Sequence, residues 1–327
     1  MRLAPLSLRL AMAACAFAAV SHAAPATAAD AGFSLQKGIK LDSRGAVDVF
    51  RVDPASRRLF VARAGGIDVI DIDAGKKVGQ LDLKGTVSAI ALSSDLGRGY
   101  ASQAGENAVT IFDPASLKVI NTEKLSGEPG SMVVDPDTKQ VFVSGAKDGQ
   151  LTAINGVTGK TAGTVALGGQ LKQAVVDTRG GLFVADAANN AIHVVDTKAL
   201  KSLGQIPTWP AEKPTGLVLD NAERRIYVAA ENNRMVIIDP DAGQMIGQVE
   251  TKAKGSTGIT IQYAPARLAW LVMPAADGNV SIIKNAKLTA TLDSTVAANV
   301  KSTSVDFDPK EKRFYLGGDS EVLVLGK

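Results

Sequence analysis

Apolar and polar residues alternate in short runs along most of the chain, and these runs recur as one unit. An apolar strand ends in Asp-Pro or a similar pair, and a polar turn with Lys or Arg leads to an apolar-aromatic-Val strand. A Gly- or Asn-rich turn, a Val-x-Ile-Asp strand, a second turn and a last alternating strand complete the unit. Each unit therefore predicts four short β-strands joined by turns. The clearest copies are VDPASRRLFVA (52–62), VDPDTKQVFVS (134–144), LDNAERRIYVA (219–229) and FDPKEKRFYLG (307–317).

The aromatic residue of the second strand measures the period of this repeat. It falls at Phe60, Tyr100, Phe142, Phe183, Tyr227, Trp270 and Tyr315, with spacings between 40 and 45 residues. Four strands in about 40 residues are typical of a propeller blade. A helical repeat would instead need long stretches with a period of about 3.6 residues. The sequence predicts an all-β, seven-bladed β-propeller with four-stranded antiparallel blades.

The two ends of the repeat region are complementary. The seventh unit stops after its third strand, at Lys327, and FSLQKGIKL (33–41) resembles the missing fourth strand when compared with KVGQLDL (77–83). We expect this N-terminal strand to pair into the last blade. Such pairing closes the ring and removes open sheet edges that would invite aggregation.

The first 29 residues differ from the repeats. Arg2 and Arg9 precede an apolar stretch of 11 residues, Leu10–Val20, which is followed by small residues. This layout predicts a signal peptide at 1–29, cleaved after residue 23 or after residue 28 or 29, and a single propeller domain at 30–327. We therefore expect a periplasmic or secreted protein. The single cysteine, Cys15, lies in the leader, where we interpret it as an apolar residue rather than a lipidation site.

Charge and hydropathy narrow the function classes only slightly. The chain has 36 basic and 33 acidic residues, and the leader holds two of the basic ones, so the mature protein is close to neutral. This balance does not point to nucleic acid or an anionic membrane. The apolar stretch of the leader is too short to span a bilayer, and no other apolar stretch is long enough, so we expect no transmembrane segment. We also expect a monomer.

The repeat resembles that of the YVTN-repeat propellers, the YncE-like family of bacterial exported proteins. The matching pieces are the Asp-Pro turn, the strands RRLFVA and RRIYVA, and VIIDPDAG. The resemblance covers 33–327, although YAPARLAWL in the sixth unit and IIKNAK depart from the pattern. It implies a binding role, since some members are thought to bind single-stranded DNA and some relatives bind proteins or surface polymers.

Few residues are candidates for catalysis or metal binding. His193 is the one histidine of the mature chain, and we interpret it as a structural strand residue. The recurring Asp of each unit is interpreted as a turn residue. We predict no catalytic residue, no metal ligand and no cofactor. A metal-dependent lactonase or other hydrolase stays an alternative, with its ion held near the axis by oxygens of Glu128, Asn189, Asn190, Glu231, Asn232, Asn233 and Asn279.

The loops that break the repeat are better candidates for a binding site. Loops between blades share one face of a propeller with the turns between second and third strands, and ligands often meet that face. Trp209 lies in such a loop, 206–215, with three prolines, so its indole is either presented to a ligand or folded under the loop as a plug. Cations accompany it on this face, although the opposite face is equally basic. The predicted ligand-binding residues are Trp209, Lys213, Arg44, Lys84, Lys172, Lys252, Lys254, Lys301 and Arg234.

Together these features predict a non-catalytic binding propeller for a protein or polymeric ligand. Single-stranded nucleic acid is the best-defined polymer for such a site, because indoles stack on bases and cations attract phosphates. Two alternatives remain: the metal-dependent lactonase or hydrolase, and a scaffold that only recruits other exported proteins.

Overall fold

The computed structural model describes residues 32–41, 47, 49–264, 268–286, 289–302 and 304–327. The predicted signal peptide at 1–29 and the candidate residue Arg44 lie outside these ranges. The described part of the chain contains no helical segment with the length and hydropathy needed to span a bilayer.

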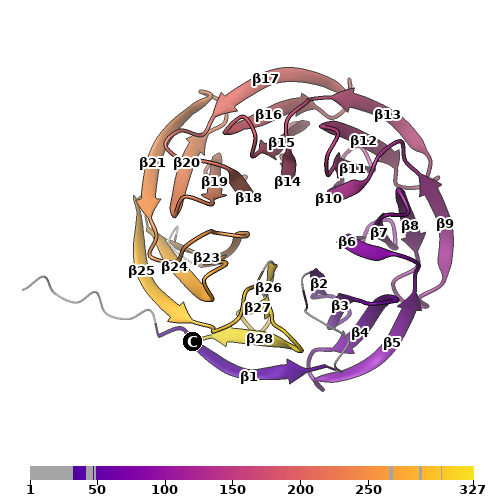
Figure 1. Cartoon of the computed structure of the whole chain (residues 1–327), viewed down its shortest axis with the longest axis horizontal. Helices are drawn as coiled ribbons and strands as arrows, with labels where there is room; N and C mark the ends of the chain where they lie inside the picture. Colours follow the sequence, from indigo (N-terminus) through magenta and orange to yellow (C-terminus); the bar gives the residue numbers. More distant parts are fainter. Residues whose placement is uncertain (1–31, 42–46, 48, 265–267, 287–288, 303) are drawn as a thin grey trace, which may run out of the picture.

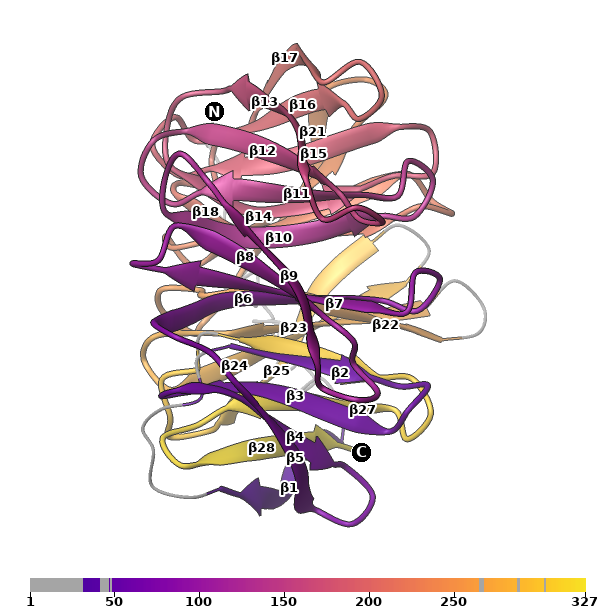
Figure 2. The ribbon, with the colours of Figure 1, turned by 90° about the vertical axis from the view of Figure 1, so that its right-hand side faces the viewer.

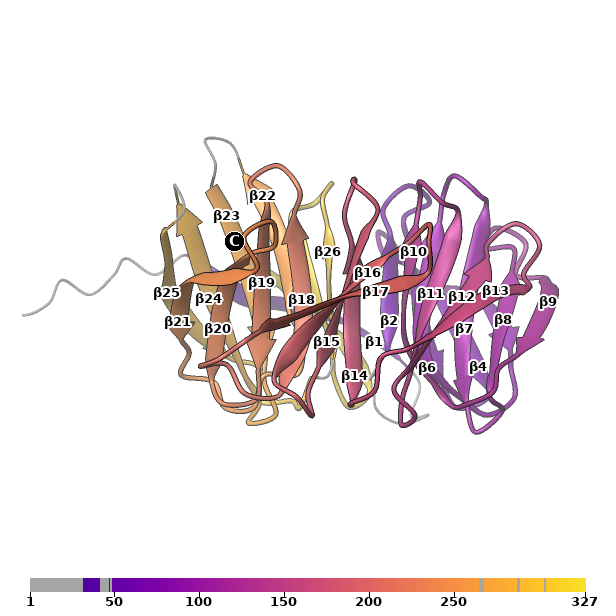
Figure 3. The ribbon, with the colours of Figure 1, turned by 90° about the horizontal axis from the view of Figure 1, so that it is seen from above.

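The described residues form seven four-stranded antiparallel sheets arranged in a ring around an axis (Figure 1). The strands of each blade follow one another from the axis outwards, and they run between the two faces of the ring (Figure 3). The fold is a seven-bladed β-propeller, as the repeat predicts. The first six blades are β2 (Phe50–Asp53), β3 (Arg58–Arg63), β4 (Gly66–Asp71), β5 (Lys76–Asp82); β6 (Thr86–Ser93), β7 (Arg98–Ala104), β8 (Ala108–Phe112), β9 (Val119–Lys124); β10 (Pro129–Asp135), β11 (Gln140–Gly145), β12 (Gln150–Asn155), β13 (Thr161–Ala166); β14 (Leu171–Val176), β15 (Gly181–Asp186), β16 (Ala191–Asp196), β17 (Lys201–Pro207); β18 (Pro214–Asp220), β19 (Arg225–Ala230), β20 (Arg234–Asp239), β21 (Gln244–Glu250); and β22 (Thr260–Ala264), β23 (Leu268–Pro274), β24 (Asn279–Ala286), β25 (Thr289–Ala297).

The seventh blade joins the two ends of the repeat region. It consists of β26 (Val305–Asp308), β27 (Arg313–Gly317), β28 (Glu321–Gly326) and, as its outer strand, β1 (Ser34–Lys40). Strand β1 pairs antiparallel with β28, from Ser34 opposite Gly326 to Lys40 opposite Glu321 (Figures 1 and 2). The predicted closure by the N-terminal strand is confirmed.

The apolar core is divided among the blade interfaces. The seven aromatic residues that set the repeat period are all buried. Among the described residues, buried side chains form seven clusters, and each cluster joins two neighbouring blades. In one of them Phe60 from the first blade packs with Phe112 from the second, with ring centroids 6.1 Å apart. Stability is thus distributed around the ring, as expected for a repeat protein.

The outer strands of the first six blades each carry one β-bulge at the same level. In β5, Lys77 pairs with Ile70 and Gly79 with Val69, which leaves Val78 as the extra residue. A bulge twists an edge strand and interrupts its ladder, which disfavours pairing with another chain. The glycine after the bulge allows close packing, since a Cβ on Gly79 would lie 2.5 Å from a methyl group of Leu117 in the next blade. The extra residues of the next five blades are Ile120, Ala162, Leu203, Ile246 and Asp293.

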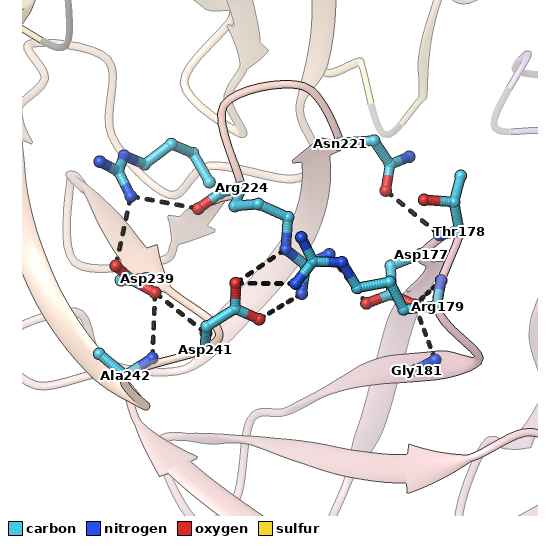
Figure 4. Close-up of polar contacts among 10 residues, drawn as sticks. Asp177, Thr178, Arg179, Gly181, Asn221, Arg224, Asp239, Asp241 and Ala242 are labelled. Atoms are coloured by element: carbon cyan, nitrogen blue, oxygen red, sulfur yellow. Dashed lines mark hydrogen bonds and ion pairs between the residues drawn. The ribbon is translucent and has the colours of Figure 1, made fainter.

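The recurring Asp residues are turn residues, in agreement with the sequence interpretation. Asp239 follows the common pattern at the end of a third strand, where its Oδ1 accepts the backbone N–H groups of Asp241 and Ala242 at 3.0 Å each (Figure 4). Asp220, at the end of a first strand, accepts the N–H groups of Ala222 and Glu223 at 2.9 and 3.0 Å. These bonds satisfy backbone donors that the turn would otherwise leave unpaired.

Two arginines connect neighbouring blades on the face opposite the inter-blade loops. Arg224 has a positive φ of 51°, and its guanidinium donates to the buried Asp177 of the preceding blade at 2.9 Å and to Asp241 of its own blade (Figure 4). Arg57 repeats this arrangement with the buried Asp308 of the seventh blade and with Asp73. We call these two contacts the arginine clasps.

Candidate functional site: the inter-blade face

The face that carries the loops between blades, together with the turns between second and third strands, is called the inter-blade face. Asparagines shape its turns and hold the loops. Asn190 and Asn233 have positive φ values of 51° and 62°. The backbone carbonyl of Asn190 accepts the N–H of Thr208 at 2.9 Å, and that of Asn233 accepts the N–H of Thr251 at 2.8 Å. Thr208 and Thr251 each begin the next loop between blades. The turn role that the sequence suggested for these two asparagines is therefore present in the structure.

The loop that holds Trp209 is fixed on both sides. Within it, the Thr208 hydroxyl donates to the carbonyl of Ala211 at 3.0 Å, and both residues are buried. The Asn190 side chain accepts the Lys213 N–H at 2.7 Å. The Asn232 amide bridges the loop, since it donates to the carbonyl of Pro210 at 2.8 Å and accepts the Glu212 N–H at 3.0 Å. The loop is thus held in place before any partner arrives.

Trp209 itself projects from this fixed loop. Its side chain is 74% exposed, the largest exposed fraction among the exposed large apolar side chains. The alternative in which the indole folds under its own loop as a plug is therefore wrong. Rigid aromatic side chains with little conformational freedom to lose are favourable anchors for a partner.

The structure brings some of the predicted cations close to the Trp209 loop. The ammonium of Lys213 lies 3.6 Å from the carboxylate of Glu231, in the neighbouring turn. Arg234 begins the strand after that turn and donates to Gln248 at 3.1 Å. Lys252 and Lys254 are exposed in the next loop along the ring. One sector, formed by the fourth to sixth blades, therefore holds the indole and four of the candidate cations.

The remaining candidates lie elsewhere on the ring. Lys84 and Lys301 are exposed in loops of other blades, and Lys172 is half-buried on the wall of the axial channel. Acidic residues also neutralise part of this face, since Glu106 lies 3.5 Å from Lys124 and Glu128 lies 2.7 Å from Lys147. Cations thus pair with carboxylates on parts of this face, whereas the Trp209 sector combines its cations with an exposed aromatic side chain.

His193 is part of a buried hydrogen-bond network. Its side chain is 2% exposed, with Nε2 3.0 Å from the Asp186 carboxylate and Nδ1 3.2 Å from the Gln205 amide. Burial acts to raise the pKa of Asp186, but hydrogen bonds from Asn189, the Gln170 N–H and His193 outweigh it and hold this pKa below the usual range. The network connects a loop and a turn of the inter-blade face, which agrees with a structural role for His193.

Several oxygens considered for an axial metal are engaged in these loops. The Asn232 amide oxygen accepts the Glu212 N–H, the Asn190 amide oxygen accepts the Lys213 N–H, and the Glu128 carboxylate pairs with Lys147. Over the described ranges, no three His, Cys, Asp or Glu side chains come together in a way that could hold a metal ion.

Comparison with known proteins shows a likeness to a repeat protein. No family model matches the chain. A segment of 149 residues is 27% identical to a ciliary WD repeat-containing protein, ctxp80, of Euplotoides octocarinatus. The match covers 43% of this chain and 20% of that protein's length.

Proposed function

We propose that this protein is a non-catalytic binding propeller of the YVTN-repeat type, exported from the cell, that holds a protein or polymeric partner on its inter-blade face. Trp209 is the anchor of this proposal. Its indole is 74% exposed on a loop whose backbone is hydrogen-bonded to the side chains of Asn190 and Asn232. An exposed indole gains most from burial in a partner, and a prefixed loop loses little entropy when it binds.

Two further observations support an interaction role. The propeller presents one broad face of loops from all its blades, a surface on which recognition residues can vary while the scaffold stays fixed. The partial likeness to a WD repeat-containing protein favours the same general class, a propeller that mediates protein interactions.

For a polymeric partner, the Trp209 sector favours single-stranded nucleic acid. A base stacked on Trp209 would place its neighbouring phosphates within the sector that holds Lys213, Arg234, Lys252 and Lys254. Base stacking on an aromatic side chain contributes about 1–3 kcal/mol per base. Each phosphate neutralised by a lysine or arginine adds a salt-dependent term.

Tryptophan fluorescence tests this proposal directly. The chain has two tryptophans, and Trp270 is buried, so a Trp270→Phe variant reports on Trp209 alone. We expect a single-stranded oligonucleotide to quench this signal, with an affinity that falls steeply as salt is raised. Trp209→Ala in the wild-type background should weaken binding by roughly tenfold or more, measured by anisotropy of a labelled oligonucleotide.

Binding that is unaffected by Trp209→Ala would contradict the assigned anchor. If oligonucleotides do not bind at all, nucleic acid is removed as the ligand. Photo-crosslinking from position 209 then tests whether a protein partner occupies the same sector.

A further inference from the structure

The inner strands of four consecutive blades begin with a second set of β-bulges. In β14, Leu171 pairs with Asp186 and Ala174 with Val184, so Lys172 and Gln173 together face one residue of β15. Bulges commonly re-aim a side chain next to a functional site. Here the bulged segments place polar side chains on the wall of the axial channel, near the inter-blade face. We call this ring segment the collar; its members are Ser88, Ser131, Lys172, Gln173 and Thr215.

Three of the four neutral members of the collar bond to the next blade, and the fourth, Thr215, donates to the Ala229 carbonyl of its own blade at 3.3 Å. The hydroxyl of Ser88 donates to the carbonyl of Pro129 at 2.9 Å, and that of Ser131 donates to the carbonyl of Lys172 at 2.7 Å. The Gln173 amide oxygen accepts the Leu217 N–H at 3.3 Å. These bonds fix the wall, whereas the Lys172 ammonium makes no hydrogen bond or ion pair within the described part of the chain.

Beyond the collar the channel wall is mostly apolar, with Arg51 as its charged residue. The inner strands present aliphatic side chains, among them Val133, Val175 and Val218, and Tyr263 lies at the far end. The Tyr263 hydroxyl donates to the carbonyl of Leu219, in the inner strand of the neighbouring blade, at 3.2 Å. The cavity has a volume of about 680 Å³, within the range of sites that bury a small organic ligand.

The charge of this cavity is positive. Of the described residues that line it, Arg51 and Lys172 are charged and none carries a carboxylate. The Arg51 guanidinium lies 3.4 Å from Asp306 of the seventh blade, so this charge is compensated. Lys172 thus supplies an uncompensated cation on a half-buried wall, where the attraction for an anion exceeds that in bulk water.

We propose that the axial channel binds a small organic anion with an apolar body. Its carboxylate or phosphate group lies at the collar against Lys172, and its apolar body extends along Val175 and Val218 towards Tyr263. This site is separate from the Trp209 sector. The channel ligand and the partner on the inter-blade face are therefore independent assignments, which separate variants can test.

Isothermal titration with four probes separates charge from apolar contact. 1-Naphthoate carries both features, 1-naphthamide has only the apolar body, and acetate has only the charge; 1-naphthyl phosphate distinguishes a phosphate from a carboxylate. We expect the two naphthyl anions to bind more tightly than the amide and acetate. Lys172→Gln should weaken 1-naphthoate by roughly tenfold or more, the range for a hydrogen bond to a charged group.

Three further variants control for indirect effects. Lys252→Gln removes an exposed cation outside the channel, and Trp209→Ala removes the proposed anchor of the other site; both should leave 1-naphthoate affinity unchanged. Lys172→Glu should reverse the preference, so that 1-naphthylmethylamine binds and 1-naphthoate does not. Equal binding of the amide and the anion, an unchanged affinity in Lys172→Gln, or no binding of any probe at millimolar concentration would each overturn the proposal.

Discussion

Removing the Arg224 clasp should destabilise the propeller far more than removing its exposed neighbour Arg179. Both arginines contact Asp241, at 2.6 Å for Arg224 and 3.2 Å for Arg179. The Arg224 side chain is 15% exposed and also reaches Asp177, which is 3% exposed, whereas Arg179 is 63% exposed (Figure 4). The two variants Arg224→Ala and Arg179→Ala therefore share one partner and differ in burial.

The magnitude follows from the bonds that are lost. The buried charged hydrogen bond to Asp177 is worth about 1.5–3 kcal/mol, and the half-exposed pair with Asp241 adds at most about 1 kcal/mol. Asp177 keeps the backbone N–H groups of Arg179 and Gly181 at 2.8 and 2.7 Å, so its carboxylate is not left without donors. We expect Arg224→Ala to lower the free energy of unfolding by about 2–4 kcal/mol. Arg179→Ala should cost less than about 1 kcal/mol.

Urea denaturation followed by circular dichroism measures both values, with thermal melting as a second readout. Alanine keeps the Cβ of Arg224, so the backbone cost of its positive φ is the same in the variant and in the wild type. Arg57→Ala provides an independent copy of the experiment, since the Asp308 partner of Arg57 is also buried. Equal and small losses for Arg224→Ala and Arg179→Ala would refute the assigned contribution of the clasps.

The other expected outcomes concern closure, pH and the exposed indole. Phe33→Ala should lower the free energy of unfolding by about 3 kcal/mol in urea titrations, because this buried ring packs against Trp270, with ring centroids 5.4 Å apart. Deletion of 33–41 should give aggregated or unfolded protein by size-exclusion chromatography, and a soluble, cooperatively melting product would argue against closure by β1. Since the pKa of Asp186 is held below its unfolded value of about 3.9, its contribution to stability is present above that pH and is lost as the pH falls through its folded pKa. Asp186→Asn should therefore flatten the acid side of the stability profile, and an unchanged profile would contradict this. Trp209→Ala should leave the free energy of unfolding within about 0.5 kcal/mol of wild type, because the side chain is exposed.

The repeat made the fold predictable because each blade buries equivalent residues in the same way. Seven aromatic residues at regular spacing set the blades, and the missing last strand pointed to 33–41 as the closing strand. Recurrence also identified Asp220 and Asp239 as turn residues, since a functional residue has no reason to appear once per blade.

Features that depend on contacts between blades were harder to predict from the sequence. Arg224 and Arg225 are adjacent in the chain, yet only Arg224 reaches the preceding blade, because its positive φ turns the side chain in that direction. The collar depends on bulges, which shift the register by one residue and leave little trace in an alternating pattern. The exposure of Trp209 was one of two interpretations of its proline-rich loop, and its exposed fraction of 74% decides between them.

Site-directed photo-crosslinking tests the central claim most directly. A photoreactive phenylalanine analogue replaces Trp209 on the inter-blade face or Val157, an exposed apolar residue in the turn after β12 on the opposite face. The full chain is then irradiated in cells that express it, and adducts are identified by mass spectrometry. The account predicts one discrete partner crosslinked from position 209 and none from position 157. A partner crosslinked only from position 157, or no adduct from position 209, would contradict it.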